Sequence, residues 1–135
     1  MKVLFVCNGN VGRSPMAKAL FNKLSKKSKS NSAGVEVAIE GTAGLPTNLM
    51  NIAVMKEVGC NLTRHKRAQL TKTMVDRSDV IVFLGSKKKM PDYLKKSKKV
   101  RFWRVRDPKR QSMATRRQIR DKIKIKVEDL IGEIG

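Results

Sequence analysis

The 135-residue chain has few cysteines, histidines and aromatic residues, and each shortage excludes a class of protein. Two cysteines, Cys7 and Cys60, cannot build the disulfide framework of a small secreted domain, and with the single His65 they match no zinc-binding spacing. Aromatic residues make up 4% of the chain, which disfavours a platform that stacks single-stranded nucleic acid. Only four apolar residues separate Lys2 from Cys7, too few for a signal peptide or a membrane span. We expect one cytoplasmic domain over residues 1–135, a monomer without metal and without membrane contact.

Acidic residues are scarce as well, because 11 Asp and Glu stand against 31 Lys and Arg, a net charge of +20. The segment Ser86–Lys126 contains 18 basic and 3 acidic residues, so most of the excess lies there. Such a charge attracts phosphates, acidic peptides or nucleic acid. It does not separate a solvated surface from a nucleic-acid interface, whose contact residues would be Lys87–Lys89, Lys95–Lys99 and Arg116–Arg120.

The periodicity of the apolar residues predicts an alternation of strands and helices. Lys2–Val6 is short and apolar, as a buried parallel strand would be, and the spacing after Pro15 predicts a helix with Ser14 as its cap and Pro15 at its first position. The polar stretch Lys26–Gly34 is expected to be a surface loop. Further strands are expected at 35–39, 79–84 and 100–105, and helices at 49–58 and 115–131. The predicted fold is α/β with three layers, a four-stranded parallel sheet flanked by helices on both faces.

The residues CNGNVGRS between the first strand and the first helix are expected to form a phosphate-binding loop. In an open α/β sheet, ligands bind where strands end and helices begin. Glycine and asparagine allow a tight backbone whose N–H groups cradle an anion, and a guanidinium matches two phosphate oxygens. The predicted phosphate-binding residues are Asn8, Gly9, Asn10, Val11, Gly12 and Arg13, and Arg13 would also stabilise the transition state.

Cys7 lies at the base of this loop and is the candidate nucleophile, because the amide dipoles, the helix N-terminus and Arg13 favour a thiolate. The alternative is a small buried residue at a strand end. Ser14 would either donate a hydrogen bond to the sulfur or only cap the helix. A departing alkoxide or phenoxide needs an acid, and Asp107, stiffened by Pro108, follows the last strand at the same sheet edge. The predicted catalytic residues are therefore Cys7, Arg13 and Asp107, with Ser14 in support.

These residues resemble the low-molecular-weight protein tyrosine phosphatase family. The chain reads VCNGNVGRSPMA where the family pattern is V-C-x-G-N-x-x-R-S-P-M-A. Similarity continues through IEGTAGLP, MKEVG, RHKRAQLT, DVIVFL, the Asp-Pro loop and RDKIKIKVEDLI, and so covers nearly the whole chain. The resemblance implies the same four-stranded parallel sheet and a phosphatase that needs no metal or organic cofactor.

The resemblance also implies roles for individual residues. Cys7 would attack phosphorus to form a cysteinyl-phosphate, while Asp107 would protonate the leaving oxygen and then activate water. Asn10 would brace the loop through side-chain hydrogen bonds. Expected ligands are a phosphoprotein, with phosphotyrosine the leading substrate, or a small phosphomonoester, and phosphate, sulfate or a similar oxyanion in the loop. His65 is expected to be structural, and Cys60 is expected to pack in the core.

Three departures from the family pattern bear on the activity. Gly12 stands where many members carry a second cysteine, so no disulfide within the loop can protect Cys7. Lys109 and Arg110 stand where many phosphatases carry aromatic residues, which favours an acidic or less aromatic substrate. Arsenate reductases are also similar, but FLGSKKKMPDY lacks the two cysteines of those that use thioredoxin. An arsenate reductase that recruits an external small thiol is the first alternative, and a binder of nucleic acid or another polyanion is the second.

Overall fold

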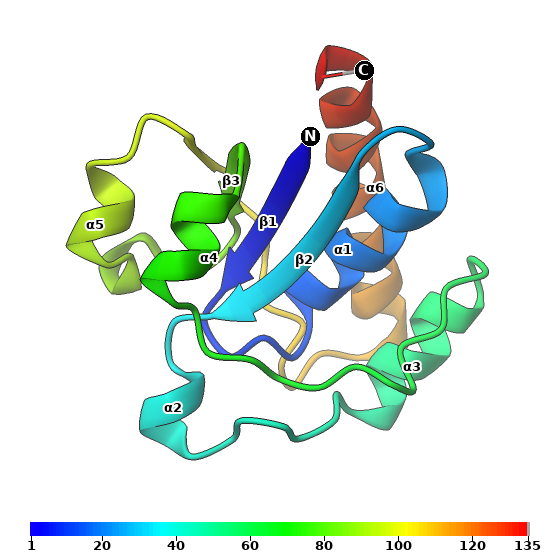
Figure 1. The fold of residues 1–135 in the computed structure, drawn as a ribbon. Helices are drawn as coiled ribbons and strands as arrows, with labels where there is room; N and C mark the ends of the chain where they lie inside the picture. The colour runs from blue at the N-terminus through cyan, green and yellow to red at the C-terminus, as the bar shows by residue number, and fades with distance from the viewer. Residues whose placement is uncertain (135) are drawn as a thin grey trace.

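The computed structural model describes residues 1–134, and its centre is a four-stranded parallel sheet. The strands are β1 (Lys2–Cys7), β2 (Lys29–Gly34), β3 (Val80–Phe83) and β4 (Val100–Phe102), in the order β2-β1-β3-β4. Each pair is parallel, and β1 lies between β2 and β3 in the middle of the sheet (Figure 1). The helices are α1 (Arg13–Leu24), α2 (Val37–Glu40), α3 (Leu49–Lys56), α4 (Lys72–Arg77), the 3-10 helix η1 (Lys87–Lys89), α5 (Asp92–Lys95) and α6 (Met113–Ile134).

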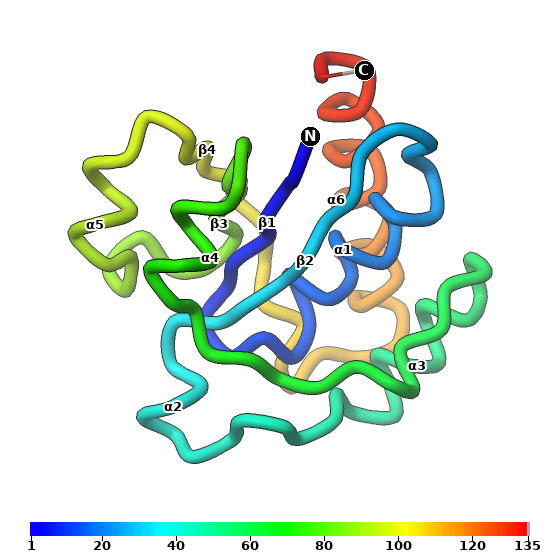
Figure 2. The backbone as a smooth tube through the Cα atoms, viewed as in Figure 1, coloured from blue at the N-terminus to red at the C-terminus, as the bar shows by residue number. Residues whose placement is uncertain are grey.

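Helices cover both faces of the sheet, as predicted. On one face Val3 and Phe5 of β1 pack with α1, α3 and α6 in the larger core. There the rings of Phe5 and Phe21 pack edge to face, with their centroids 5.8 Å apart. On the other face Leu4 and Val6 pack in a smaller core with residues of α4 and α5. The tube in Figure 2 shows α4 and α5 together on one side of β1 and β3, and α1 and α6 on the other. Because a strand sends alternate side chains to opposite faces, β1 is buried on both.

The second strand lies earlier in the chain than predicted. The predicted strand at 35–39 is wrong, since Val37–Glu40 forms the short helix α2, and the predicted loop Lys26–Gly34 contains β2 instead. Strand β2 is polar because it is an edge strand: it pairs with β1 along its length, and its other edge is paired only at Gly34, through an isolated bridge to Gln69 among residues 1–134. The apolar alternation after Gly34 did not mark one buried face, because Val37 is buried whereas Ile39 is 85% exposed.

The first helix also begins differently from the prediction. Gly12 is at the N-cap position without a side-chain cap, Arg13 is the first helical residue and Pro15 is the third. Ser14 is inside the helix, and its hydroxyl is used by Cys7 and Asn10 instead of capping. The other predicted elements are present with shifted ends: β3 and β4 are shorter, and α6 is longer than 115–131.

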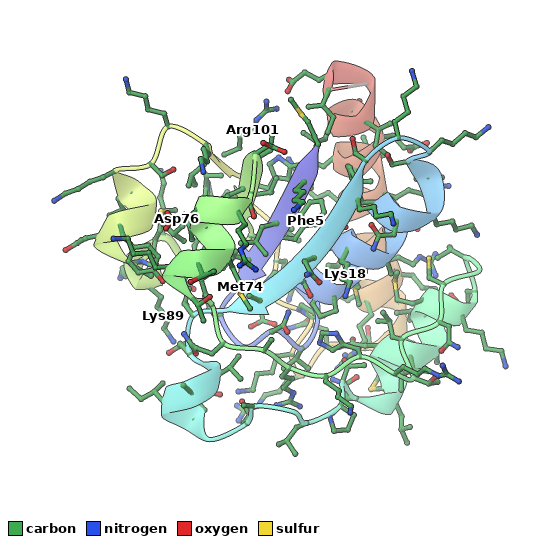
Figure 3. The ribbon with its side chains drawn as sticks, in the orientation of Figure 1. Phe5, Lys18, Met74, Asp76, Lys89 and Arg101 are labelled. Atoms are coloured by element: carbon green, nitrogen blue, oxygen red, sulfur yellow. The ribbon has the colours of Figure 1, made fainter. Side chains whose placement is uncertain are left out.

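Many of the basic side chains point away from the ribbon around the rim of the molecule (Figure 3). Among residues 1–134, no helix has both the length and the apolar composition that a membrane crossing requires.

A single carboxylate, that of Glu57 at the end of α3, is held by two arginines of α6. Glu57 accepts hydrogen bonds from Arg117 at 2.9 Å and from Arg120 at 2.6 Å. These two hydrogen bonds, Arg117 first, lower the pKa of Glu57 from 4.5 to about 2. A glutamate with a depressed folded pKa stabilises the fold above its unfolded pKa, and that stabilisation is lost as the pH falls through the folded pKa.

Glu57→Gln is therefore expected to lower the free energy of unfolding at pH 7, and the difference from wild type should shrink as the pH falls from about 4.5 to about 2. Urea unfolding at several pH values measures this difference. Glu128→Gln is the matched control, since Glu128 makes no ion pair among residues 1–134. A Glu57→Gln difference that stays constant with pH would contradict the assignment.

Candidate active site

The succession of strand, loop and helix places Cys7 in the lining of a pocket. Cys7 is the last residue of β1 and is 2% exposed, and residues 8–12 turn the chain into α1. The Cys7 Sγ lies 2.9 Å from the Ser14 Oγ, and either atom can be the donor. The hydroxyl of the second residue of α1 is thus within hydrogen-bond distance of the sulfur, the contact that a thiolate would need.

Asn10 holds the loop from inside. Its φ of 54° is in the left-handed region, and its side chain is fully buried. The Nδ2 donates to the Oγ of Ser14 at 2.8 Å and of Ser32 at 3.1 Å, while the Oδ1 accepts from the Ala68 N–H at 3.0 Å. The Asn10 amide therefore ties the loop to α1, to β2 and to the segment before α4.

His65 completes this brace. Its Nε2 lies 2.7 Å from the Asn10 carbonyl oxygen, so it donates in the tautomer that carries the proton on Nε2. Burial lowers the pKa of His65, although the hydrogen bond to Asn10 partly opposes the shift. His65 is thus a hydrogen-bonded structural residue, as the sequence predicted.

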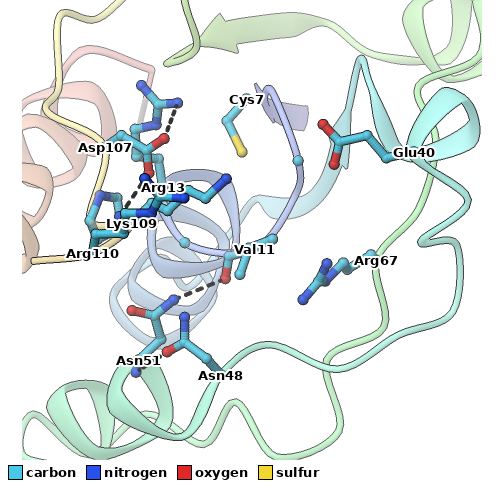
Figure 4. Close-up of a pocket in the computed structure, with 13 residues that line it drawn as sticks. Cys7, Val11, Arg13, Glu40, Asn48, Asn51, Arg67, Asp107, Lys109 and Arg110 are labelled. Atoms are coloured by element: carbon cyan, nitrogen blue, oxygen red, sulfur yellow. Dashed lines mark hydrogen bonds and ion pairs between the residues drawn. The ribbon is translucent and has the colours of Figure 1, made fainter.

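One pocket brings the three predicted catalytic residues together. It contains Cys7, Arg13 and Asp107, and the Arg13 Nη2 lies 3.5 Å from the Asp107 Oδ2. Arg13 is 6% exposed, and its Nη1 also donates to the Val105 carbonyl at 3.2 Å, which fixes the guanidinium in the lining of the pocket. The lining residues are Cys7, Gly9, Val11, Gly12, Arg13, Glu40, Asn48, Asn51, Arg67, Asp107, Pro108, Lys109 and Arg110 (Figure 4).

The loop after β4 presents Asp107 to this pocket. The Asp107 Oδ1 accepts from the Lys109 N–H at 3.0 Å, and the Gln111 N–H donates to the Pro108 carbonyl at 3.1 Å, so the loop is a hydrogen-bonded turn. Pro108 rests directly on Gly12, where an added Cβ would collide with the proline ring. Glycine at position 12 therefore allows the loop that carries Asp107 and Pro108, named the acid loop, to lie against residues 7–14, named the phosphate loop.

A second close approach is made by Gly34 at the end of β2. A Cβ there would meet the Asn8 carbonyl oxygen at 2.7 Å and the Asn10 nitrogen at 2.8 Å, both backbone atoms of the phosphate loop. Such distances are not tolerated, so Gly34 lets the loop pack against β2.

The carbonyl of Val11 is held by a buried polar network. It accepts from the Thr47 Oγ1 at 2.5 Å and from the Asn51 Nδ2 at 3.3 Å. Behind Asn51, the Arg116 Nη1 donates to the Asn51 Oδ1 at 2.5 Å, and the Arg116 Nε donates to the Gln111 carbonyl at 2.9 Å. Arg116 is 4% exposed, so one buried guanidinium joins the acid loop, α3 and, through Asn51, the phosphate loop.

Arg116→Met is expected to lower the free energy of unfolding by about 2–4 kcal/mol, because the acceptors on Asn51 and Gln111 would lose a buried charged donor. Arg117→Met is the matched control on the next residue of α6: its ion pair with Glu57 is exposed, so the loss of stability should be much smaller than for Arg116→Met. Urea unfolding measures both, and equal losses would contradict the role given to Arg116.

The structure places four of the six predicted phosphate-binding residues at the pocket. Gly9, Val11, Gly12 and Arg13 line it. Asn8 and Asn10 do not line the pocket. The Asn8 side chain forms hydrogen bonds with the backbone N–H and hydroxyl of Ser86, and the Asn10 side chain points into the interior of the loop. Within residues 1–134, no group of three or more His, Cys, Asp and Glu side chains is arranged to hold a metal ion.

The sequence analysis did not identify Asn48, Asn51, Arg67, Glu40 and Arg116 as residues of the site or its support. Asn48 carried a local signal, since a residue of this type before a predicted helix is a typical cap, and it does accept from the Asn51 N–H. The positions of all five residues at or behind the pocket depend on packing between elements that are distant in the chain.

Taken together, fold and site define a parallel α/β protein in which the segment from the end of β1 to the start of α1 brings a cysteine and an arginine to one pocket. The model of the family described as low molecular weight phosphotyrosine protein phosphatase matches residues 2–135, and the chain belongs to this family.

Two curated relatives and one solved structure illustrate the range of the similarity. The "Probable low molecular weight protein-tyrosine-phosphatase EpsP" of Ralstonia solanacearum is 36% identical over 64% of this chain, a match that spans only 57% of that protein. The "Glutaredoxin arsenate reductase" of Synechocystis sp. is 31% identical over 99% of this chain and 98% of its own. Wzb of Vibrio vulnificus, solved in complex with benzylphosphonate, has a TM-score of 0.88 at 24% identity and covers 98% of both chains. This last likeness confirms the predicted fold.

Proposed function

We propose that this protein is a phosphatase that hydrolyses phosphate monoesters, phosphotyrosine in proteins included, through a cysteinyl-phosphate intermediate. The observation that carries the proposal is the single pocket that holds the Cys7 sulfur, the Arg13 guanidinium and the Asp107 carboxyl. Nucleophile, anion clamp and acid are the three groups that transfer of a phosphoryl group to sulfur requires.

The reaction proceeds in two balanced steps. The Cys7 thiolate attacks phosphorus, an S–P bond forms, the P–O bond to the leaving group breaks, and Asp107 gives its proton to the departing oxygen. Water then attacks the phosphorus while the Asp107 carboxylate takes a proton from it, and the S–P bond breaks to release phosphate and restore the thiolate. Arg13 binds the equatorial oxygens throughout, and the Ser14 hydroxyl, 2.9 Å from Sγ, stabilises the sulfur when it is negatively charged.

Reduction of arsenate is the second candidate, favoured by the relative from Synechocystis that is aligned over 99% of this chain. In a reductase, Cys7 would form an adduct with arsenate, and a second thiol must then attack the Cys7 sulfur, so that a disulfide forms, the S–As bond breaks and arsenite leaves. The one other cysteine, Cys60, is buried in the larger core and is absent from the lining of the Cys7 pocket. Reduction would therefore need an external thiol, whereas hydrolysis needs only water.

The two activities are tested side by side on the wild-type protein. Release of phosphate from phosphotyrosine and from 4-nitrophenyl phosphate measures hydrolysis, and arsenate-dependent oxidation of glutathione or reduced thioredoxin measures reduction. We expect hydrolysis with both phosphates and no arsenate-dependent loss of thiol. Thiol consumption without hydrolysis would replace the phosphatase proposal with the reductase.

A further inference from the structure

The pocket contains more positive charge than one phosphate group uses. Beyond Arg13, three cationic side chains line it: Arg67 on one side of Cys7 and Val11, and Lys109 and Arg110 on the other (Figure 4). We propose that these three cations form a second anion subsite, so that the preferred substrates are phosphate monoesters that carry another negative group close to the scissile phosphate. This inference rests on the proposed function, because the phosphate itself is assigned to the Cys7 loop.

Arg67 is the most firmly held of the three. Its backbone N–H donates to the Leu45 carbonyl at 2.9 Å and its carbonyl accepts from the Gly44 N–H at 2.8 Å. Its Nε donates to the Pro46 carbonyl at 3.1 Å, which fixes the plane of the guanidinium. The two terminal nitrogens make no hydrogen bond or ion pair within residues 1–134, so a bidentate face stays available to an anion beside the loop.

Arg110 and Lys109 face Arg67 across the pocket. Arg110 has a φ of 62°, a left-handed conformation that is uncommon for a residue with a Cβ, and the turn closed by Gln111 and Pro108 holds it there. Neither Lys109 nor Arg110 forms an ion pair with a carboxylate among the residues described. The turn that carries Asp107 therefore also carries two uncompensated cations to the pocket rim.

The carboxylates of the pocket do not cancel this charge. Only Glu40 and Asp107 line it, against Arg13, Arg67, Lys109 and Arg110. Asp107 already lies 3.5 Å from Arg13, and Glu40 makes no ion pair with Arg67. No aromatic side chain lines the pocket, so a bare phenyl ring meets cations there instead of a stacking surface. A ligand with a second anion satisfies these cations, whereas a neutral leaving group leaves them to water.

The second anion can be an acidic side chain near a phosphotyrosine or a second phosphate on a small molecule, and two sets of probes distinguish these sources. The first is a pair of phosphotyrosine peptides that differ only in glutamate against glutamine on both sides of the tyrosine, so that the leaving group is the same. The second pair is benzylphosphonate and 1,4-xylylene bisphosphonate, which are not hydrolysed and report binding by calorimetry alone.

For wild type we expect the glutamate peptide to exceed the glutamine peptide by about fivefold in kcat/KM, with the ratio falling at high salt. Arg67→Gln should bring the ratio close to one, and Arg110→Asn, which tolerates the left-handed backbone, should reduce it in part. Arg64→Gln is the matched control. Arg64 is three residues before Arg67, is exposed and lies outside the pocket, so its replacement removes the same charge and the ratio should stay at its wild-type value. A preference for the bisphosphonate with no preference between the peptides would assign the subsite to a second phosphate on a small molecule.

Equal rates on both peptides together with equal binding of both phosphonates would overturn the inference and leave the phosphatase proposal standing. A preference that Arg67→Gln and Arg110→Asn both leave unchanged would also overturn it. Tighter binding of the bisphosphonate in a protein that hydrolyses neither peptide would support the subsite and refute the phosphatase proposal, so the two failures are distinguishable.

Discussion

Replacing Cys7 by serine is expected to lower the turnover of 4-nitrophenyl phosphate by about four to six orders of magnitude. The serine hydroxyl is a far weaker nucleophile than a thiolate, and the side chain hydrogen-bonded to position 7 among residues 1–134, that of Ser14, is not a base. The substitution changes one atom at a buried position, so the loop, its Arg13 clamp and the brace by Asn10 should persist. Phosphate should therefore still bind to the variant with an affinity near that of wild type. Release of 4-nitrophenol and calorimetric titration with phosphate measure the two properties.

Cys60→Ala is the matched control for this experiment. Cys60 is 6% exposed in the larger core, and burial raises the pKa of its thiol, which keeps it neutral. Its removal should cost some stability and leave the turnover within about twofold of wild type. A Cys7→Ser variant that retained more than about one per cent of the wild-type rate would show that the sulfur is not the nucleophile.

Asp107→Asn should produce the second-largest effect, and its size should depend on the leaving group. Loss of a general acid costs about 10²- to 10⁴-fold where the departing oxygen needs a proton, as for phenyl phosphate or phosphotyrosine. In kcat/KM, which reports the first step, the loss should be much smaller for 4-nitrophenyl phosphate, because 4-nitrophenolate leaves without protonation. A series of substituted phenyl phosphates measures the dependence of kcat/KM on the pKa of the leaving phenol, which should steepen in the variant.

The second half of the cycle gives an independent check, because the same carboxylate is assigned to activate water. Rapid mixing of Asp107→Asn with 4-nitrophenyl phosphate should show a burst of nitrophenol followed by slow turnover, as the cysteinyl-phosphate accumulates. Asp92→Asn removes a carboxylate of α5, outside the pocket, and should change neither the burst nor the leaving-group dependence. A uniform loss on every substrate without a burst would assign Asp107 a structural role in the turn.

The phosphate loop was predictable because its determinants are local. Eight consecutive residues contain the strand end, the tight turn, the arginine and the start of the helix, and the structure brings Cys7 and Arg13 to one pocket. Asp107 was predictable for a similar reason, since residues that follow parallel strands meet at the same edge of the sheet. The parallel sheet itself followed from the apolar runs of β1 and β3, which are buried on both faces.

The features that escaped the sequence analysis depend on contacts between distant parts of the chain. Strand β2 is built from KSNSAG, which has no apolar alternation, and it becomes a strand because the edge of β1 offers it hydrogen-bond partners. Arg116 has the same local context as its neighbour Arg117, yet the first is buried against α3 and the second lies at the surface. Propensity cannot separate two adjacent arginines when the difference lies in partners distant in the chain, Asn51 for Arg116 and Glu57 for Arg117.

The contact between Gly12 and Pro108 limits how this loop could change in evolution. A cysteine codon is one base away from a glycine codon, so a single base change can place a second thiol at position 12 of the loop that begins at Cys7. In this protein the new Cβ would displace the Pro108 ring and, with it, the acid loop. A lineage that gained protection against oxidation by that single step would lose the present position of Asp107, and only a paired change at both positions would keep that protection together with the proposed hydrolysis.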